Sequence, residues 1–164
     1  MEQKQSEYFS EIDADLLESD ATYIAHQCNI QNIHTERLKC IAKSICDKWP
    51  HAVYEHQVLG NIQICGGPLS EEQNRGIINI FAQRYPSYSK YSNDTKLMRL
   101  TWFQNALQKI VLAFNELDES ERILHVPCKI GCALAGGNWK VYRQLLEQCA
   151  NENQIFITCC KLTS

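Results

Sequence analysis

The sequence predicts an α/β fold, a three-layer α/β/α sandwich built on a mixed, mostly parallel sheet. Short apolar runs typical of strands alternate along most of the chain with amphipathic helical segments. This alternation favours a parallel sheet with helices on both faces. The 164 residues suffice for one domain with a substantial core. We expect a flexible polar tail over residues 1–7 and a single domain over 8–164.

Most of the sheet is expected in the first half of the chain. The β-branched run at Gly76–Ala82 predicts a buried strand. Thr35 is expected to cap a helix that runs to Trp49, because apolar residues recur every three or four positions and Pro50 follows. The strands predicted in this half are Tyr8–Ile12, Tyr23–His26, Asn61–Cys65 and Gly76–Ala82.

The second half of the chain contains two expected helices. Gln83–Ser92 contains Pro86 and several tyrosines, which predicts a long surface loop. Asn93 and Asp94 are expected to cap the first helix, and Asn138 begins the second, which ends near Ala150. The apolar stripe of the first is Leu97, Leu100, Phe103, Leu107, Ile110, Val111, Phe114 and Leu117, and the buried face of the second is Val141, Tyr142, Leu145, Leu146 and Cys149. The strands expected here are Ile123–Val126 and Gln154–Cys159.

The segment Val126–Trp139 predicts a site for an anion. An apolar strand enters a loop of small residues, which in turn opens a helix, and three of the seven glycines lie here. Backbone N–H groups and the helix dipole favour negative charge at such a place, and missing side chains let a phosphate approach closely. In a parallel sheet, the loops after His26, Ala82 and Val126 would meet at one edge.

Composition narrows the possible functions. A net charge of −3 argues against a nonspecific nucleic-acid binder, and no apolar run approaches the ~20 residues of a membrane span. The N-terminus lacks the apolar region of a secretory signal, and nine cysteines without a CxxC pair indicate a reduced protein. We therefore expect a cytoplasmic protein. Cys28, His34 and Cys40, with or without His26, fit no common zinc spacing, so we expect no metal.

Taken in order, several segments resemble the macrodomain family over nearly the whole chain. The branch that they resemble most contains the terminal ADP-ribose protein glycohydrolase and the ADP-ribose-1″-phosphate phosphatases, with a viral or microbial character. The resemblance rests on Ile12–Leu17, Ile24–Asn29, Ile78–Pro86, Asn93–Lys96 with Arg99–Phe103, and Pro127–Trp139.

The resemblance implies a cleft for ADP-ribose and a set of ligand-binding residues. Asp15 would bind the adenine amino group, Leu16 would supply a backbone amide, and Asn29 would face the distal ribose. Phe81 and Trp139 would pack either on the ligand or in the core. The residues implied to line the diphosphate are Gly131, Cys132, Ala133 and Leu134, and Ala135 is a further implied ligand-binding residue.

One loop departs from the family pattern. Macrodomains carry a glycine-rich run after the second strand, whereas this chain has Leu38–Ala42 there and no glycine between Ala25 and Gly60. Side chains block the close approach that glycine allows. Arg37 or Lys39 would either supply charge in place of amides or form a solvated helix face.

The residues implied for catalysis also differ. Ala135 stands where the glycohydrolase branch has an aspartate, and the lysine expected near Ala82–Arg84 is absent. Arg84 cannot replace it, because a guanidinium stays protonated. His26, His34 and Asn29 are the polar groups that could lie near the cleft, although a histidine at a strand end more often has a structural role. Cys132, at a helix N-terminus, could have a lowered pKa and act as a nucleophile.

Three hypotheses of function follow. The first is a binding module for ADP-ribose or a related nucleotide without efficient turnover, a possible pseudoenzyme that needs no cofactor and could bind ADP-ribosylated protein. The second is a remodelled domain whose altered loop closes the cleft, with another nucleotide signal or a protein as its partner. The third is an ADP-ribosyl hydrolase or an ADP-ribose-1″-phosphate phosphatase. The viral resemblance suggests an antagonist of host ADP-ribose signalling in the host cytoplasm or nucleus.

Overall fold

The sheet has the mixed, mostly parallel arrangement that the sequence predicts. The structure is a computed structural model that describes residues 7–31, 40–54, 57–132 and 135–162. Its six strands lie in the order β1-β6-β5-β2-β4-β3, and every neighbouring pair is parallel except β3 with β4. The strands are β1 (Phe9–Asp13), β2 (Tyr23–Asn29), β3 (Ile62–Cys65), β4 (Ile77–Gln83), β5 (Ile123–Pro127) and β6 (Phe156–Lys161).

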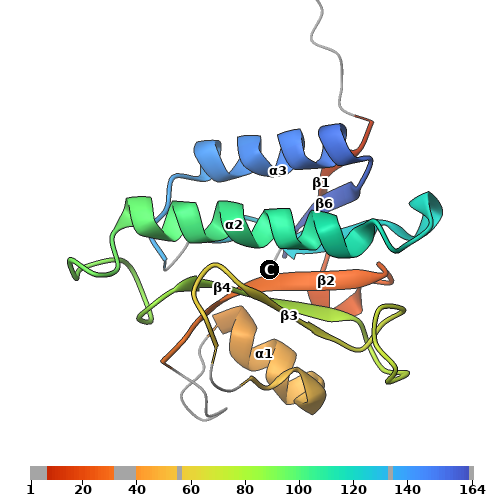
Figure 1. Cartoon of the computed structure of the whole chain (residues 1–164), viewed down its shortest axis with the longest axis horizontal. Helices are drawn as coiled ribbons and strands as arrows, with labels where there is room; N and C mark the ends of the chain where they lie inside the picture. The colour runs from red at the N-terminus through yellow and green to blue at the C-terminus, as the bar shows by residue number, and fades with distance from the viewer. Residues whose placement is uncertain (1–6, 32–39, 55–56, 133–134, 163–164) are drawn as a thin grey trace, which may run out of the picture.

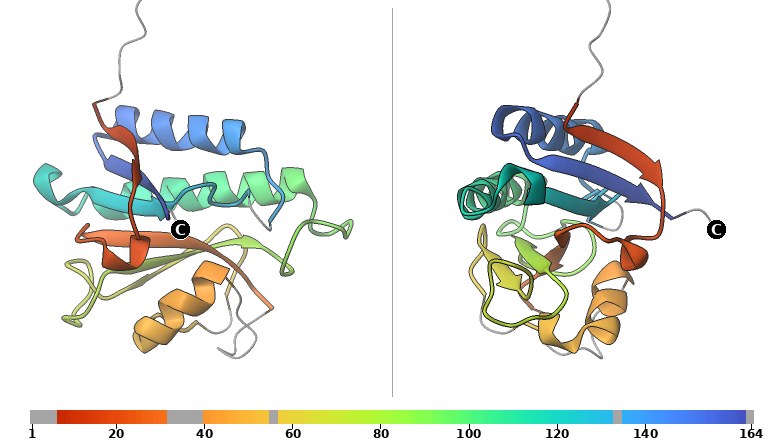
Figure 2. Two further views of the ribbon diagram at one scale, coloured as in Figure 1. Left: turned by 180° about the vertical axis from the view of Figure 1, so that it is seen from behind. Right: turned by 90° about the vertical axis from the view of Figure 1, so that its right-hand side faces the viewer.

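Helices cover both faces of this sheet, which confirms the predicted three-layer sandwich (Figure 1). Helices α2 (Lys96–Phe114) and α3 (Trp139–Asn153) lie side by side on one face. Helix α1 (Cys40–Lys48) lies on the other, as the two views in Figure 2 show. The adjacent inner strands β2 and β4 are therefore shielded from water on both sides.

Alternating side chains of β2 and β4 supply the two halves of the core. Successive residues of a strand point to opposite faces. Tyr23 and Ile78 pack on the side of α2 and α3, whereas Ile24 and Ile77 pack on the side of α1. Every residue of β4 is buried, which confirms the buried strand predicted from its β-branched run.

The start of α2 differs from the prediction. Thr95, not Asn93 or Asp94, caps the helix, because the Thr95 hydroxyl accepts a hydrogen bond from the Met98 amide at 3.1 Å. The carboxylate of Asp94 turns inward instead. Leu97, expected in the apolar stripe, lies in the first turn of the helix and is 72% exposed.

The other two helices match the prediction more closely. Asn138 caps α3, as expected, but the helix continues to Asn153 and leaves Val141 exposed rather than buried. Helix α1 ends at Lys48, because a separate 3₁₀ turn begins after Trp49. The predicted helix start at Thr35 lies outside the described residues, and so does most of the predicted tail.

No helix of the described segments is long and apolar enough to cross a membrane.

Candidate ligand-binding cleft

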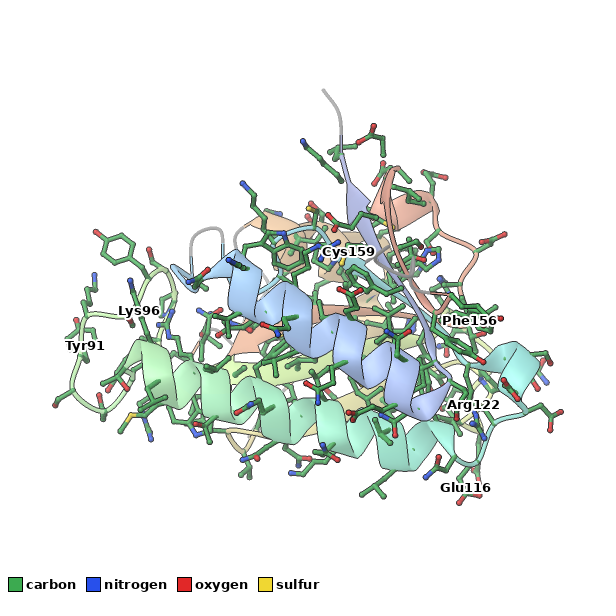
Figure 3. All side chains as sticks on the ribbon, turned by 90° about the horizontal axis from the view of Figure 1, so that it is seen from above. Tyr91, Lys96, Glu116, Arg122, Phe156 and Cys159 are labelled. Carbon is green, nitrogen blue, oxygen red and sulfur yellow. The ribbon has the colours of Figure 1, made fainter. Side chains whose placement is uncertain are left out.

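A cleft of about 720 Å³ lies over the carboxyl ends of β2, β4 and β5. The loops that follow His26, Ala82 and Val126 meet there, as the strand order requires. Figure 3 shows one lining residue, Tyr91, near Lys96 at the first turn of α2, at the far end of that helix from Glu116. The lining residues are Gln27–Asn29, Ile41, Ala42, Tyr54, Gln83, Tyr85–Ser87, Lys90, Tyr91, Pro127–Cys132 and Ala135.

The loop after β5 is wound into tight turns. Lys129 (φ 62°), Gly131 (φ 76°) and Gly136 (φ 78°) have left-handed backbone conformations. The Cys132 amide donates to the Lys129 carbonyl at 2.9 Å, and the Gly137 amide donates to the Gly131 carbonyl at 3.1 Å. These amides are used to hold the shape of the loop. Because these two amides already donate to carbonyls of the loop, a bound anion would have to accept hydrogen bonds from other groups.

Gly131 has no room for a side chain. A Cβ atom there would lie 2.5 Å from a ring carbon of Tyr142 and 2.9 Å from Oε1 of Gln27. The Tyr142 ring is itself fixed against Phe103 on α2, with ring centroids 4.8 Å apart. The backbone of Gly131 is therefore in direct contact with the Tyr142 ring of the core, and this contact fixes the position of the loop at the cleft.

A buried arginine joins two walls of the cleft. Arg99 on α2 is 2% exposed, and its Nη2 lies 2.5 Å from Oδ2 of Asp94. Its Nη1 donates to the carbonyls of Ser87 (2.7 Å) and Ala135 (3.0 Å), and its Nη2 donates to that of Tyr85 (3.1 Å). One guanidinium therefore connects the loop after β4 with the loop after β5.

Asp94 completes this arrangement. Its two carboxylate oxygens accept hydrogen bonds from the backbone amides of Arg84 (3.0 Å) and Tyr85 (3.1 Å). Burial alone would raise the pKa of this carboxyl, but the hydrogen bonds from Arg99 and from the two amides lower it below its usual value. Asp94 is therefore ionised at neutral pH.

Sequence reasoning missed the structural role of Asp94 and Arg99. The two residues lie in the segments that carry the family resemblance, but an acid and a base five positions apart at a helix start are normally exposed. Only the packing of α2 against both loops shows that they are buried.

The rim of the cleft carries aromatic and cationic side chains. The rings of Tyr85 and Tyr91 are tilted at 58° to each other with centroids 4.7 Å apart, and the Lys90 ammonium lies 5.9 Å from the Tyr91 ring. Lys129 is exposed on the opposite loop. Among the described lining residues there is no carboxylate and no imidazole. The described part of the cleft therefore offers positive charge and aromatic surfaces, and neither a carboxylate nor an imidazole.

Asn29 and Ala135, both predicted site residues, line the cleft together with Gly131 and Cys132. The side chain of Asn29 accepts a hydrogen bond from the Gln31 amide at 2.9 Å. The predicted residues Ala133 and Leu134 lie outside the described residues. His34, a possible polar group of the cleft, and Arg37 and Lys39, possible sources of charge, also lie outside the described residues.

The remaining predicted residues do not line the cleft. Asp15 accepts a hydrogen bond from the Leu17 amide at 3.0 Å, and Leu16 is buried on the side of α1. Phe81 is completely buried and packs edge-to-face on Tyr54, and Trp139 is half-buried against the core. Asp15 follows β1, which lies two positions from β5 in the sheet.

Cys132 is not an activated thiol. Burial raises its pKa to about 12, although the charge of Lys129 opposes the shift. The expectation of a lowered pKa was wrong, because the thiol lies within the folded loop rather than at an open helix end. The eight cysteines whose side chains the structure describes are all free, and no group of described residues could hold a metal ion.

His26 lies beneath the cleft rather than in it. Its side chain is fully buried, and its Nε2 lies 2.5 Å from Oδ1 of Asn79 on the neighbouring strand. Asn79 also donates to the Ala52 carbonyl at 2.8 Å. Burial lowers the pKa of His26 to about 4, and the Asn79 hydrogen bond only partly offsets this. His26 is therefore a neutral core residue, which is the structural role that is common for a histidine at a strand end.

The His26 pKa predicts a pH-dependent stability. Below pH 6.5 the unfolded chain binds a proton on this imidazole, whereas the folded chain does not until about pH 4. The contribution of the buried neutral His26 to the free energy of unfolding is fully present above pH 6.5. It is lost as the pH falls to 4, a change of about 3 kcal/mol. Urea unfolding at pH 7 and pH 5 should show about 2 kcal/mol of this change, because pH 5 still lies above the folded pKa. In His26→Asn this pH dependence should be smaller, and an unchanged slope would contradict the assignment.

No protein-family model matches the chain, and no curated protein matches it in sequence. Solved structures share its fold. The macrodomain of Mycobacterium tuberculosis DarG is 18% identical, with a TM-score of 0.72 over 95% of this chain and 98% of that one. A Bacteroides thetaiotaomicron protein of unknown function is 22% identical, with a TM-score of 0.71 over 94% and 98%. The macrodomain of Thermus aquaticus DarG is 19% identical, with a TM-score of 0.66 over 95% and 98%. The chain therefore has the macrodomain fold.

Proposed function

We propose that the cleft binds ADP-ribose or a related nucleotide without efficient turnover. The observation that carries this proposal is the loop after β5. It presents left-handed Lys129 and Gly131 to a cleft over the carboxyl ends of the strands, where ligands of parallel α/β sheets bind. The resemblance of the sequence to macrodomains gives the nature of the ligand, and the macrodomain fold supports it.

In this proposal the diphosphate lies against the loop that contains Gly131 and Ala135, and Asn29 faces the distal ribose. Lys90 and Lys129, both at the rim, supply positive charge to a ligand with two negative phosphates. The adenine extends from the cleft across β6 toward Asp15. The Cys128 amide donates to the Cys160 carbonyl at 2.8 Å, so that the ends of β5 and β6 form a continuous edge in that direction.

The side chains at the end of β4 support binding rather than hydrolysis. Gln83 occupies the region where a nucleophilic lysine is expected, and its amide is held by the carbonyls of Tyr85 and Ser87. An amide is neither a nucleophile nor a base at neutral pH. General acid–base catalysis needs a titratable group within reach of the substrate. No described lining residue supplies a carboxylate or an imidazole for it.

Two measurements on one preparation test the proposal. Calorimetric titration with ADP-ribose should give saturable heat, and incubation with an ADP-ribosylated protein should release no ADP-ribose above the uncatalysed rate. Release of the sugar would favour a hydrolase. Absence of heat at high micromolar protein would contradict binding and favour the remodelled domain with a different ligand.

A further inference from the structure

A second surface lies beside the cleft, where the loop after β4 leads into the first turn of α2. It exposes four large apolar side chains and two lysines in one short segment of the chain. We call it the loop–helix surface, and it consists of Tyr88, Lys90, Tyr91, Lys96, Leu97 and Met98. Lys90 and Tyr91 also line the cleft, whereas the other four residues do not. Large apolar side chains gathered on a surface normally mark a site of interaction.

Contacts along the segment hold these side chains together. The Lys90 ammonium lies 6.0 Å from the centroid of the Tyr88 ring and 5.9 Å from that of the Tyr91 ring. The Asp94 amide donates to the Tyr91 carbonyl at 3.0 Å, so the loop turns directly into the helix. Figure 3 shows Tyr91 and Lys96 at this end of α2. The loop residues and the first turn of the helix therefore form one connected surface.

Every exposed charge of this surface is positive. The segment from Arg84 to Met98 contains one acidic residue, Asp94, which is completely buried and paired with Arg99. Four exposed acidic side chains follow the opposite end of α2 instead, at Glu116, Asp118, Glu119 and Glu121. Although the chain has a net charge of −3, this end of α2 is positive and attracts an anionic partner.

The arrangement of the rings favours a polypeptide over a single-stranded nucleic acid as that partner. Bases bind by stacking on open aromatic faces along a basic groove. Here the rings of Tyr85 and Tyr91 pack on each other, with centroids 4.7 Å apart. The Arg84 guanidinium lies over the Trp102 ring, 5.9 Å from its centroid. The exposed Leu97 offers an aliphatic contact, which suits the apolar side chains of a polypeptide.

We propose that the loop–helix surface binds an acidic segment of a partner protein, with its carboxylates at the two lysines and its apolar side chains at Tyr88, Leu97 and Met98. This inference goes beyond the proposed function, because most of the surface lies outside the lining of the cleft. The bound segment lies next to the cleft, since Lys90 and Tyr91 belong to both. Peptide binding and nucleotide binding can therefore be measured separately.

Fluorescence anisotropy with a short labelled peptide of glutamate, leucine and serine tests the inference. At low salt this peptide should bind saturably, and added salt should weaken the binding. The counterpart with lysine in place of glutamate should not bind, and an oligothymidylate of similar length should bind more weakly than the glutamate peptide. Absence of saturable binding of the glutamate peptide overturns the inference, and so does equal or tighter binding of either comparison probe.

Substitutions on α2 provide a matched comparison. Lys96→Ser combined with Leu97→Ser should weaken the binding of the glutamate peptide by about tenfold, because it removes one exposed charge pair and one apolar contact. Lys109→Ser combined with Leu112→Ser removes the same two types of side chain from exposed positions further along the helix. This control should leave peptide affinity within about twofold of the wild type, and equal weakening by the two double substitutions overturns the inference.

ADP-ribose affinity separates this inference from the proposed function. Lys96 and Leu97 do not line the cleft, so their double substitution should leave ADP-ribose affinity within about twofold of the wild type. If that variant does not fold, as melting will show, Tyr88→Ser replaces it, and unchanged peptide affinity in Tyr88→Ser overturns the inference. A wild-type chain that binds the glutamate peptide but no ADP-ribose overturns the proposed function and supports this inference.

Discussion

Replacement of Arg99 by methionine is expected to lower the free energy of unfolding by about 3–5 kcal/mol, because it leaves a buried carboxylate without its partner. Both side chains of the Arg99–Asp94 pair are almost completely excluded from water. The substitution also removes the hydrogen bonds to the carbonyls of Ser87 and Ala135, which join the two walls of the cleft. Both stability and ligand affinity should therefore fall.

Urea unfolding of Arg99→Met and of Lys43→Met at pH 7 provides the test. Lys43 pairs with Asp47 on the surface of α1, where both side chains are about half exposed. Loss of such a pair costs about 0.5 kcal/mol or less. Equal effects of the two substitutions would contradict a structural role for the buried pair. The contribution of the Asp94 carboxylate to the free energy of unfolding should also depend on pH. It should be lost as the pH falls through the lowered pKa of Asp94 in the folded protein, because protonation removes the negative charge that pairs with Arg99.

Replacement of Gly131 by alanine is the second large effect that we expect. The new Cβ atom would overlap the Tyr142 ring, and the backbone would remain left-handed at φ 76°. Strain and overpacking together should cost about 2–4 kcal/mol of stability. The loop can relieve the overlap only by moving away from the core, so ADP-ribose affinity should fall by about tenfold or more.

Gly60→Ala is a matched control for this substitution. Gly60 is also left-handed, at φ 81°, but an added Cβ atom would meet only ordinary contacts, the nearest at 3.5 Å on Asn105. It does not line the cleft. Gly60→Ala should therefore lose about 1–2 kcal/mol of stability through backbone strain and keep its ADP-ribose affinity. A Gly131→Ala variant that binds ADP-ribose as tightly as the wild type would contradict the proposed position of the diphosphate.

The sheet could be predicted from the sequence because its signal is local. The β-branched run of β4 and the alternation of β3 indicate strands without knowledge of their neighbours. The rule that ligands bind at the carboxyl ends of parallel strands then placed three loops at one cleft. Helix ends were less predictable, because Asp94 and Thr95 are both good capping residues. Only the buried Arg99 decides between them.

The side-chain arrangements of the site could not be predicted, because they join residues far apart in the chain. Gln27 and Gln83 are 56 positions apart, and Arg99 and Ala135 are 36 apart. For the same reason the sequence leaves both a cleft role and a structural role open for His26, since its position in the chain does not show that Asn79 lies opposite it. Alternation predicts the face on which a side chain lies, but not its partner.

A crystal structure of the chain with ADP-ribose tests the central claim most directly. We expect the diphosphate to lie against the loop that contains Gly131 and Ala135, with the adenine directed along the end of β6 toward Asp15. A nucleotide bound elsewhere on the molecule, or a cleft occupied by residues 32–39 with no nucleotide in it, would contradict the account.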